Sequence, residues 1–313
     1  MSKSYLRKVL LPQFCLWEKM KAKRKLISFD FEITARCNNN CSHCYINVSA
    51  NDSAARKKEL SLSQIEGISK EAVSLGALWC LLTGGEPLLR KDFPDIYLSL
   101  IKQGLLVSVF TNATLVNKGI VRLFKEYPPR DIEVTVYGVT KETYESVTRR
   151  RGSFQAFIKG INLLLDNKIK VRFKAMALRS NLKELPKIAK FCRKKTKDYF
   201  RFDPFLNLRF DGNLSRNQEI ISQRLSPEEI VAVEKADCKR FSLLKKICEK
   251  FVAPEFDLNK HRYIFCCGAG NSSFSVSPEG YFKLCSLLCQ PDCVYDLKKG
   301  SLKEAWNKFV PAV

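Results

Sequence analysis

The chain has 313 residues, of which 45% are hydrophobic and 27% are charged, and its formal net charge is +22. This composition is typical of a globular protein with a hydrophobic core, and no low-complexity tract interrupts it. Because every apolar run is shorter than the roughly 18 residues that a membrane span needs, we expect no membrane-spanning helix. The basic start, residues 1–25, has a short apolar run broken by Pro12 and lacks a small-residue cleavage site. We therefore expect no signal peptide and a cytoplasmic location.

The excess of Lys and Arg has two interpretations. A basic surface attracts anions such as an acidic peptide, nucleic acid or a phosphorylated substrate. Alternatively, most of the charge lies on solvated helix faces of a lysine-rich protein. Nothing else in the sequence supports nucleic acid, so charge alone does not select a substrate.

After the basic start, predicted strands and helices alternate. Ser61 with Gln64 three residues later forms a helix-starting pattern, and Gly76 ends that helix. The alternation predicts a parallel sheet, and each strand is apolar enough to be buried on both faces. The six predicted strands span 26–33, 77–82, 105–110, 131–138, 169–178 and 199–208, and the helices 61–76, 95–104, 117–127, 153–167 and 182–195.

From about residue 211 this alternation ends. Residues 211–223 are polar and predict a loop. Residues 226–251 predict a helix that begins with Ser226 as its cap and Pro227 as its first residue. Residues 272–285 predict a hairpin of two short strands whose turn contains Gly280 with a positive φ. Residues 300–310 predict a short final helix.

Distinctive motifs follow the first four predicted strands. They are a cysteine-rich loop, "GGEP", "TNAT" and "YGVT", in that order. All four lie at the carboxyl ends of their strands, where α/β folds place their chemistry. Motifs on four consecutive strand ends fit a curved sheet around one cavity better than a flat sheet with one crevice.

The thirteen cysteines fall into scattered and grouped positions. We expect the scattered ones to be small buried hydrophobes. In a reducing compartment, grouped cysteines more often ligate metal or do chemistry than form disulfides. The scattered cysteines are Cys15, Cys80, Cys192, Cys238 and Cys248, and the groups are Cys37/Cys41/Cys44 and Cys266/Cys267/Cys285/Cys289/Cys293.

The segment "RCNNNCSHC" carries Cys37, Cys41 and Cys44 in a polar loop that would not bury three thiols. A zinc site would need His43 or a remote residue as its fourth ligand, and no second zinc knuckle lies nearby. Three thiolates suit an iron–sulfur cluster in which one iron keeps an open position.

The CxxxCxxC spacing, followed in order by "TGGEPLL", "FTNATLV" and "VTVYGVTKETYESVTRRRGSF", resembles the radical SAM superfamily along most of the chain. His43 stands where that family usually has an aromatic residue, and Ala113 stands where glycine is common. The resemblance implies an α/β fold with a partial (βα)6 TIM-like barrel. It also implies that Cys37, Cys41 and Cys44 hold a 4Fe–4S cluster.

By the same resemblance, the open iron binds S-adenosylmethionine (SAM), and cleavage of SAM gives a 5′-deoxyadenosyl radical that abstracts hydrogen from a substrate. An external one-electron donor of the flavodoxin or ferredoxin type would reduce the cluster. Gly84 and Gly85 would permit close approach to SAM, Glu86 would bind its ammonium group, and Thr135 would meet its ribose. The expected cofactor-binding residues are His43, Gly84, Gly85, Glu86, Asn112 and Thr135.

The segment "CCGAGNSSFSVSPEGYFKLC" resembles the first half of the SPASM domain and its shorter relative, the twitch domain. The chain ends at Val313, just where further cysteines of that domain would follow. Three interpretations remain open. One auxiliary 4Fe–4S cluster could form here, or the chain is a truncated homologue with an incomplete auxiliary site. In the third, the region is a hairpin that carries incidental cysteines. The expected auxiliary ligands are Cys267, Cys285, Cys289 and Cys293.

These expectations divide the chain into a basic extension (1–25), a radical SAM core (26–210), a helical linker (211–260) and a shortened SPASM/twitch-like region (261–313). The favoured function is radical modification of a peptide or protein, with the basic extension holding an acidic leader peptide. One alternative is a radical dehydrogenase acting on a small molecule such as an aminosugar. Another, from a different class, is a zinc or nucleic-acid-binding module without SAM chemistry.

Overall fold

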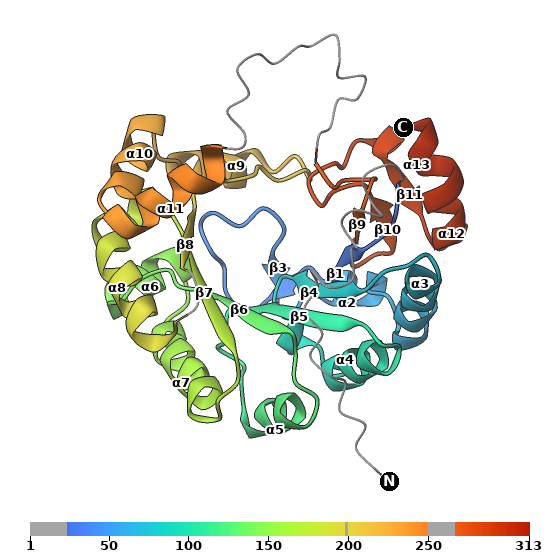
Figure 1. Cartoon of the computed structure of the whole chain (residues 1–313), viewed down its shortest axis with the longest axis horizontal. Coiled ribbons are helices and arrows are strands. Elements are labelled where there is room, and N and C mark those ends of the chain that lie inside the picture. The colour runs from blue at the N-terminus through green and yellow to red at the C-terminus, as the bar shows by residue number, and fades with distance from the viewer. Residues whose placement is uncertain (1–23, 198–199, 250–266) are drawn as a thin grey trace.

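The computed structural model describes residues 24–197, 200–249 and 267–313. Its centre is a nine-stranded sheet in the order β11-β10-β9-β1-β4-β5-β6-β7-β8. The sheet curves around an inner space, and the helices cover its outer side (Figure 1). The predicted α/β class and the predicted curved sheet are therefore confirmed.

The six predicted strands all form, and each pairs with its neighbour in parallel. The sixth is shorter than expected, because only three residues of the predicted range 199–208 pair with β7. The six strands are β1 (Ser28–Thr34), β4 (Trp79–Gly84), β5 (Leu106–Thr111), β6 (Asp131–Thr135), β7 (Val171–Met176) and β8 (Arg201–Asp203).

The predicted helices between the strands also form, and the Ser61–Gln64 capping box is present. Two further helices, α2 (Ser53–Lys58) and α6 (Lys141–Thr148), were not predicted. The predicted ones are α3 (Leu62–Ser74), α4 (Phe93–Lys102), α5 (Lys118–Glu126), α7 (Ser153–Asp166) and α8 (Leu185–Lys195), with 3-10 turns at η2 (Pro87–Leu89) and η3 (Arg179–Glu184).

The two faces of β1 differ, and this difference creates the inner space. Phe29, Phe31 and Ile33 are fully buried in the hydrophobic core. Side chains alternate across a strand, so Asp30 and Glu32 point to the opposite, inner face. Both carboxylates line a cavity. The expectation that every strand is buried in apolar surroundings on both faces is wrong for β1, because its inner face is charged.

The C-terminal region continues the same sheet beyond β1. β9 (Ser273–Val276) pairs in parallel with β1, and β10 (Tyr281–Lys283) and β11 (Val294–Asp296) follow antiparallel. Phe274 stacks on Phe29 at 5.3 Å between ring centroids, which buries the junction. The predicted hairpin is confirmed, including Gly280 with φ +90°. The chain then forms α12 (Leu302–Glu304), a π-helical turn (Ala305–Phe309) and α13 (Val310–Ala312).

Two expectations between the barrel and this hairpin are wrong. The predicted loop 211–223 contains α9 (Leu214–Ser222), whose start is capped by Asn213. The predicted single helix 226–251 is divided into α10 (Pro227–Lys235) and α11 (Cys238–Glu249). The division has a local cause, since the Asp237 side chain accepts a hydrogen bond from the Arg240 backbone N–H and begins a new helix. The Ser226 cap and Pro227 at the first position are confirmed.

The scattered cysteines behave in two ways. Cys80 and Cys192 are buried as expected, whereas Cys238 and Cys248 are exposed, because α11 leaves those positions outside the core. Cys15 and Cys266, and residues 1–23 of the basic extension, lie outside the described residues.

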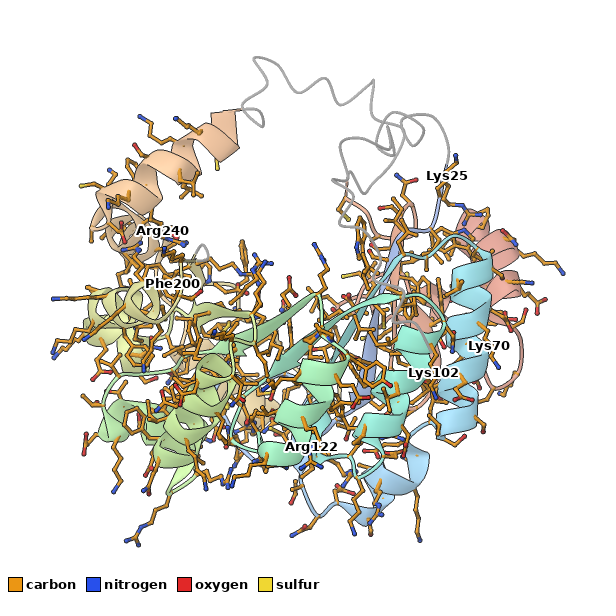
Figure 2. All side chains as sticks on the ribbon, turned by 60° about the horizontal axis from the view of Figure 1, so that its bottom comes forward. Lys25, Lys70, Lys102, Arg122, Phe200 and Arg240 are labelled. Atoms are coloured by element: carbon orange, nitrogen blue, oxygen red, sulfur yellow. The ribbon has the colours of Figure 1, made fainter. Side chains whose placement is uncertain are left out.

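Basic side chains on the outer helices extend into solvent. Lys70 on α3, Lys102 on α4 and Arg122 on α5 are exposed and point away from the sheet (Figure 2). These positions favour the interpretation that much of the charge lies on solvated helix faces. Within the described ranges, no helix is long and apolar enough to cross a membrane.

Candidate active site

A cavity of about 350 Å³ lies inside the curved sheet. This volume falls within the range of roughly 300–1,000 Å³ that is typical of small-molecule sites. The wall is built from the loop after β1, from the segments after β8 and β10, and from strands β1, β4, β5, β6, β7 and β8. Of the sequence-predicted residues, it contains Cys37, Cys41, His43, Cys44, Gly84, Gly85, Asn112 and Thr135.

The cysteine loop, residues 37–47, lies inside the arc of strands (Figure 1). Its backbone is held mainly by neighbouring elements. The N–H groups of Asn40 and Ser42 donate to the carbonyls of Thr148 and Val147, 2.9 and 3.0 Å away, at the end of α6. The loop is closed by pairing of β2 (Arg36–Cys37) with β3 (Val48–Ser49). Its conformation therefore depends on the barrel that surrounds it.

The expectation that this polar loop would not bury its thiols is wrong for Cys41, which is buried, while Cys37 and Cys44 are partly buried. Burial, together with the charge of Glu86, raises the pKa of Cys37 to about 12. Burial is also the main cause of the raised pKa values of Cys41 and Cys44. A cation bound at these sulfurs would favour the thiolate and reverse the shift.

The thiol arrangement bears on the choice between zinc and a cluster. Among the described residues, no three His, Cys, Asp or Glu side chains are placed to hold one metal ion together. Three thiolates are the donor set of a 4Fe–4S cluster in which one iron keeps an open position, whereas a structural zinc ion takes four ligands. The chemistry of Cys37, Cys41 and Cys44 suits such a cluster, and their assignment as its ligands stays a prediction.

Buried polar groups without a hydrogen-bond partner are concentrated on the cysteine loop. Within the described structure, no hydrogen-bond partner is found for four such atoms: both amide atoms of Asn39, Nδ1 of His43 and Oδ1 of Asn47. All three residues line the cavity. Since the great majority of buried polar groups are hydrogen-bonded, this concentration indicates a polar ligand. The pKa of His43 is lowered to about 4, chiefly by burial, so its ring is neutral at pH 7.

The two glycines after β4 allow a close backbone crossing. A Cβ on Gly84, whose φ is +123°, would lie 2.2 Å from the Thr34 carbonyl oxygen. A Cβ on Gly85 would lie 2.3 Å from the Arg36 carbonyl oxygen. The N–H of Gly85 donates to the Thr34 carbonyl at 2.7 Å, and that of Glu86 to the Arg36 carbonyl at 3.0 Å. The glycines thus hold the chain that enters Cys37, and their contact with SAM stays a prediction.

Glu86 is fully buried and is not part of the cavity wall. Its Oε1 accepts from the Thr111 hydroxyl at 2.8 Å and the Leu88 N–H at 3.0 Å, and its Oε2 accepts from the Asn112 N–H at 2.8 Å. Burial raises its pKa to about 7. These bonds connect the end of β4 to the end of β5, so they favour a role for Glu86 in positioning the two strand ends. Its contact with the SAM ammonium group stays a prediction.

Asn112 connects the end of β5 to the first cysteine. Its Nδ2 donates to the Asn38 side chain at 2.9 Å and lies 3.8 Å from the Cys37 sulfur. Asn38 in turn donates to the Thr114 hydroxyl at 2.8 Å. Asn38 and Thr114 were not predicted as site residues. The available signals were the polar run between Cys37 and Cys41 for Asn38 and the "TNAT" motif for Thr114.

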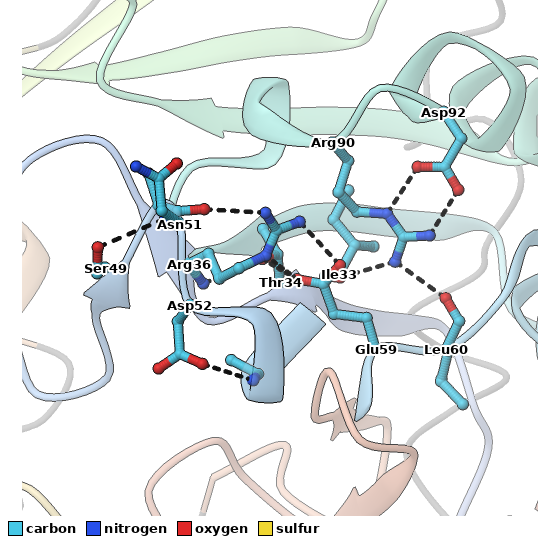
Figure 3. A network of polar contacts seen from close by, with 12 residues as sticks. Ile33, Thr34, Arg36, Ser49, Asn51, Asp52, Glu59, Leu60, Arg90 and Asp92 are labelled. Carbon is cyan, nitrogen blue, oxygen red and sulfur yellow. Dashed lines mark hydrogen bonds and ion pairs between the residues drawn. The ribbon is translucent and has the colours of Figure 1, made fainter. Parts of the chain in front are cut away.

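A buried ion pair supports the strand that enters the cysteine loop (Figure 3). The Arg36 guanidinium donates to both carboxylate oxygens of Glu59, at 2.8 and 3.0 Å, and to the Ala50 carbonyl at 3.0 Å. Nearby, Arg90 pairs with Asp92 and donates to the Ile33 carbonyl at 2.9 Å. Sequence analysis missed both pairs, because neither belongs to a motif.

Charged residues on the inner face of the sheet were also missed. Lys174 lines the cavity, pairs with Glu133 at 3.1 Å and lies 4.5 Å from the ring centroid of Phe110. Glu32 forms a buried ion pair with Lys283 of β10 at 3.3 Å. The alternating pattern "FDFEI" was a sequence signal for the inner carboxylates. No sequence signal indicated Lys283 on β10 as a partner.

The C-terminal cysteines differ in exposure and in their distance along the chain from the cavity wall. Cys285 and Cys289 flank Ser286 and Leu287, which line the cavity. Cys267 is exposed, and Cys289 and Cys293 are partly buried. No three of the described C-terminal cysteines are placed to bind one metal ion. Their assignment to an auxiliary cluster stays a prediction.

Comparison with known proteins identifies the family. The sequence model of the Radical SAM superfamily matches residues 31–192, and the chain belongs to this superfamily, whose enzymes use a 4Fe–4S cluster and SAM. It is 28% identical to the antilisterial bacteriocin subtilosin biosynthesis protein AlbA of Bacillus subtilis, over 82% of this chain and 54% of AlbA. It is 30% identical to a probable GTP 3′,8-cyclase of Methanocaldococcus jannaschii, over 56% of this chain and 58% of that protein. The chain thus spans about half the length of these relatives.

The fold resembles that of a solved superfamily structure. Streptococcus suis SuiB bound to S-adenosylmethionine superposes with a TM-score of 0.68 and 14% identity, covering 94% of this chain and 69% of SuiB. A structure of SuiB bound to its precursor peptide SuiA superposes with a TM-score of 0.65 and 15% identity, over 99% of this chain and 74% of SuiB. The similarity supports the partial-barrel fold. Membership of the superfamily argues against the zinc or nucleic-acid-binding alternative.

Proposed function

We propose that Cys37, Cys41 and Cys44 hold a 4Fe–4S cluster and that this chain uses SAM to abstract hydrogen from a peptide or protein substrate. The observation that carries the proposal is the cysteine loop itself. The loop carries three thiols and the unpartnered polar groups of Asn39, His43 and Asn47 on one wall of the cavity. Such a wall suits a cluster with a polar ligand beside it.

When bound, the cluster supplies one electron for the reductive cleavage of SAM. The chain's own residues do the positioning. Gly84 and Gly85 hold the strand end that enters Cys37, and the Asn112 amide fixes Asn38 beside it. The amides of Asn39 and Asn47 offer hydrogen bonds to a polar ligand.

A peptide is the substrate class that the comparisons favour. The match to AlbA, a bacteriocin biosynthesis protein, extends over 82% of the chain, beyond the residues matched by the superfamily model. The match to the GTP cyclase covers 56%. The cavity also reaches the surface, because Phe205 lines it and is 80% exposed. An extended chain crossing this opening would present one side chain to the interior.

The proposal is tested with anaerobically reconstituted protein, SAM and dithionite or reduced flavodoxin. The substrates are a panel of synthetic peptides containing Cys, Ser or Thr, together with an aminosugar and GTP. We expect some peptides to raise 5′-deoxyadenosine formation several-fold and to lose two hydrogens by mass. Turnover with the aminosugar or GTP and with no peptide would overturn the peptide assignment and favour a small-molecule dehydrogenase or cyclase.

A further inference from the structure

Two arginines from the segment after β8 donate hydrogen bonds to the backbone of the cysteine loop. Arg209 Nη1 donates to the Asn47 carbonyl at 3.0 Å. Arg216 Nη2 donates to the Cys41 carbonyl at 2.9 Å. Only 8% and 16% of these two side chains are exposed, so both guanidinium groups are largely withdrawn from solvent. Both residues lie outside the range 31–192 that the superfamily model matches.

Each guanidinium is fixed by contacts on its other side. Arg209 pairs with Asp211 at 2.6 Å, and its backbone N–H donates to the Asn217 side chain at 2.7 Å. Arg216 pairs with Glu219, which also pairs with Arg149 at the end of α6. The arginine pair, Arg209 and Arg216, is therefore held by residues 211–219 and, through Glu219, by Arg149 after α6.

The two contacts lie on either side of Cys44 in the sequence. Arg216 reaches the loop at the carbonyl of Cys41, and Arg209 reaches it at the carbonyl of Asn47. The arginine pair therefore brings two guanidinium groups to the backbone of the loop that carries the three cysteines.

We propose that Arg209 and Arg216 are positioning residues that hold the cysteine loop and raise the reduction potential of the cluster bound to it. This inference rests on the proposed function. Reduction adds one negative charge to a cluster that already carries thiolates. Nearby cations and hydrogen bonds to the surrounding chain favour the reduced form, and these are the levers by which proteins tune such potentials. The pair supplies both.

The test is a redox titration of the reconstituted full chain, followed by the electron paramagnetic resonance signal of the reduced cluster. The variants are Arg216→Met, which removes the charge and the bond, and Arg216→Lys, which keeps the charge. We expect Arg216→Met to lower the ratio of reduced to oxidised cluster at fixed potential by about three- to tenfold. Tenfold corresponds to about 59 mV for one electron. Arg209→Met should act in the same direction, and Arg216→Lys should retain most of the wild-type potential.

Arg224→Met is the matched control. Arg224 also donates to a backbone carbonyl, that of Leu206 at 2.9 Å, but within the described residues it donates no hydrogen bond to the cysteine loop. A wild-type potential in this control together with lowered potentials in the two methionine variants supports the inference. Unchanged potentials in Arg209→Met and Arg216→Met would overturn it.

A second readout covers variants that bind iron poorly. Hydrogen exchange of the backbone amides of residues 38–47 should be faster in both methionine variants than in the Arg224→Met control. Equal exchange rates would contradict the positioning role even where no potential can be measured. If the wild-type chain itself binds no cluster, the proposed function fails and this inference falls with it. If wild type binds a cluster and the variants show the wild-type reduction potential and the wild-type exchange rates, only the proposed role of the arginine pair is refuted.

Discussion

Replacing Gly85 by Ala adds a single methyl group at the backbone crossing beside the cysteine loop. The new Cβ would lie 2.3 Å from the Arg36 carbonyl oxygen, 2.6 Å from the Ala35 carbonyl oxygen and 2.7 Å from the Arg36 carbonyl carbon. All three are backbone atoms, so no side chain can rotate away. The Arg36–Glu59 pair restrains this strand end from its other side. Overpacking a close-packed site usually costs about 1–3 kcal/mol, and we expect the upper end, about 3 kcal/mol.

Gly67 offers a matched control within the same chain. It lies inside α3, and a Cβ there meets nothing within 4 Å. Gly67→Ala should therefore raise the free energy of unfolding by about 0.5–1 kcal/mol through helix propensity. Urea denaturation of the two apoproteins should show a difference of about 4 kcal/mol, and Gly85→Ala should also bind less iron after reconstitution. Equal stabilities of Gly85→Ala and wild type would refute the argument that the glycines serve this crossing.

Three further predictions follow from contacts around the cavity. Glu59→Ala leaves the buried Arg36 guanidinium without its carboxylate, so it should lower the free energy of unfolding by about 3–5 kcal/mol. A loss below about 1 kcal/mol would show that the pair is solvated. The pKa of Glu86 is about 7 in the folded protein, above its usual 4.5, so its contribution to stability is full below pH 4.5 and is lost as the pH rises through 7. The difference in free energy of unfolding between wild type and Glu86→Gln should therefore shrink between pH 5 and pH 8. Parallel curves of stability against pH would contradict this. Ala113 is fully buried and has a φ of +62°, a conformation that strains a β-branched residue. Ala113→Val should therefore lower the free energy of unfolding by about 2 kcal/mol or more, while Ala113→Gly should stay within about 1 kcal/mol of wild type. Equal denaturation midpoints for the two variants would refute this account of backbone strain.

The positions of the motifs could be predicted from the sequence because parallel strands bring their carboxyl ends to one edge of a sheet. Cys37, Gly85 and Asn112 follow three different strands, and the alternation of strands and helices was sufficient to place them around one cavity. The burial of Phe29, Phe31 and Ile33 followed from their period of two. These inferences needed only local pattern and the geometry of the fold class.

The partners of those residues could not be predicted, because they depend on how distant segments pack. Nothing in "GGEP" indicates that its glycines face the carbonyls of Thr34 and Arg36, and nothing around Glu59 indicates Arg36. The missed helix α9 is polar, and only its cap, Asn213, signalled its start. The exposure of Cys238 depends on where α11 packs, which its sequence does not specify. The arginine pair lies more than 160 residues from the carbonyls that it contacts.

The central claim is that Cys37, Cys41 and Cys44 hold the cluster that cleaves SAM. The most direct measurement compares wild type with the triple Ala variant after anaerobic reconstitution, scoring iron and 5′-deoxyadenosine formed under dithionite. We expect the variant to lose one cluster, about four irons, and to form no 5′-deoxyadenosine. Iron remaining in the variant would belong to Cys267, Cys285, Cys289 and Cys293, the predicted auxiliary site. A triple variant that still produces 5′-deoxyadenosine would contradict the claim.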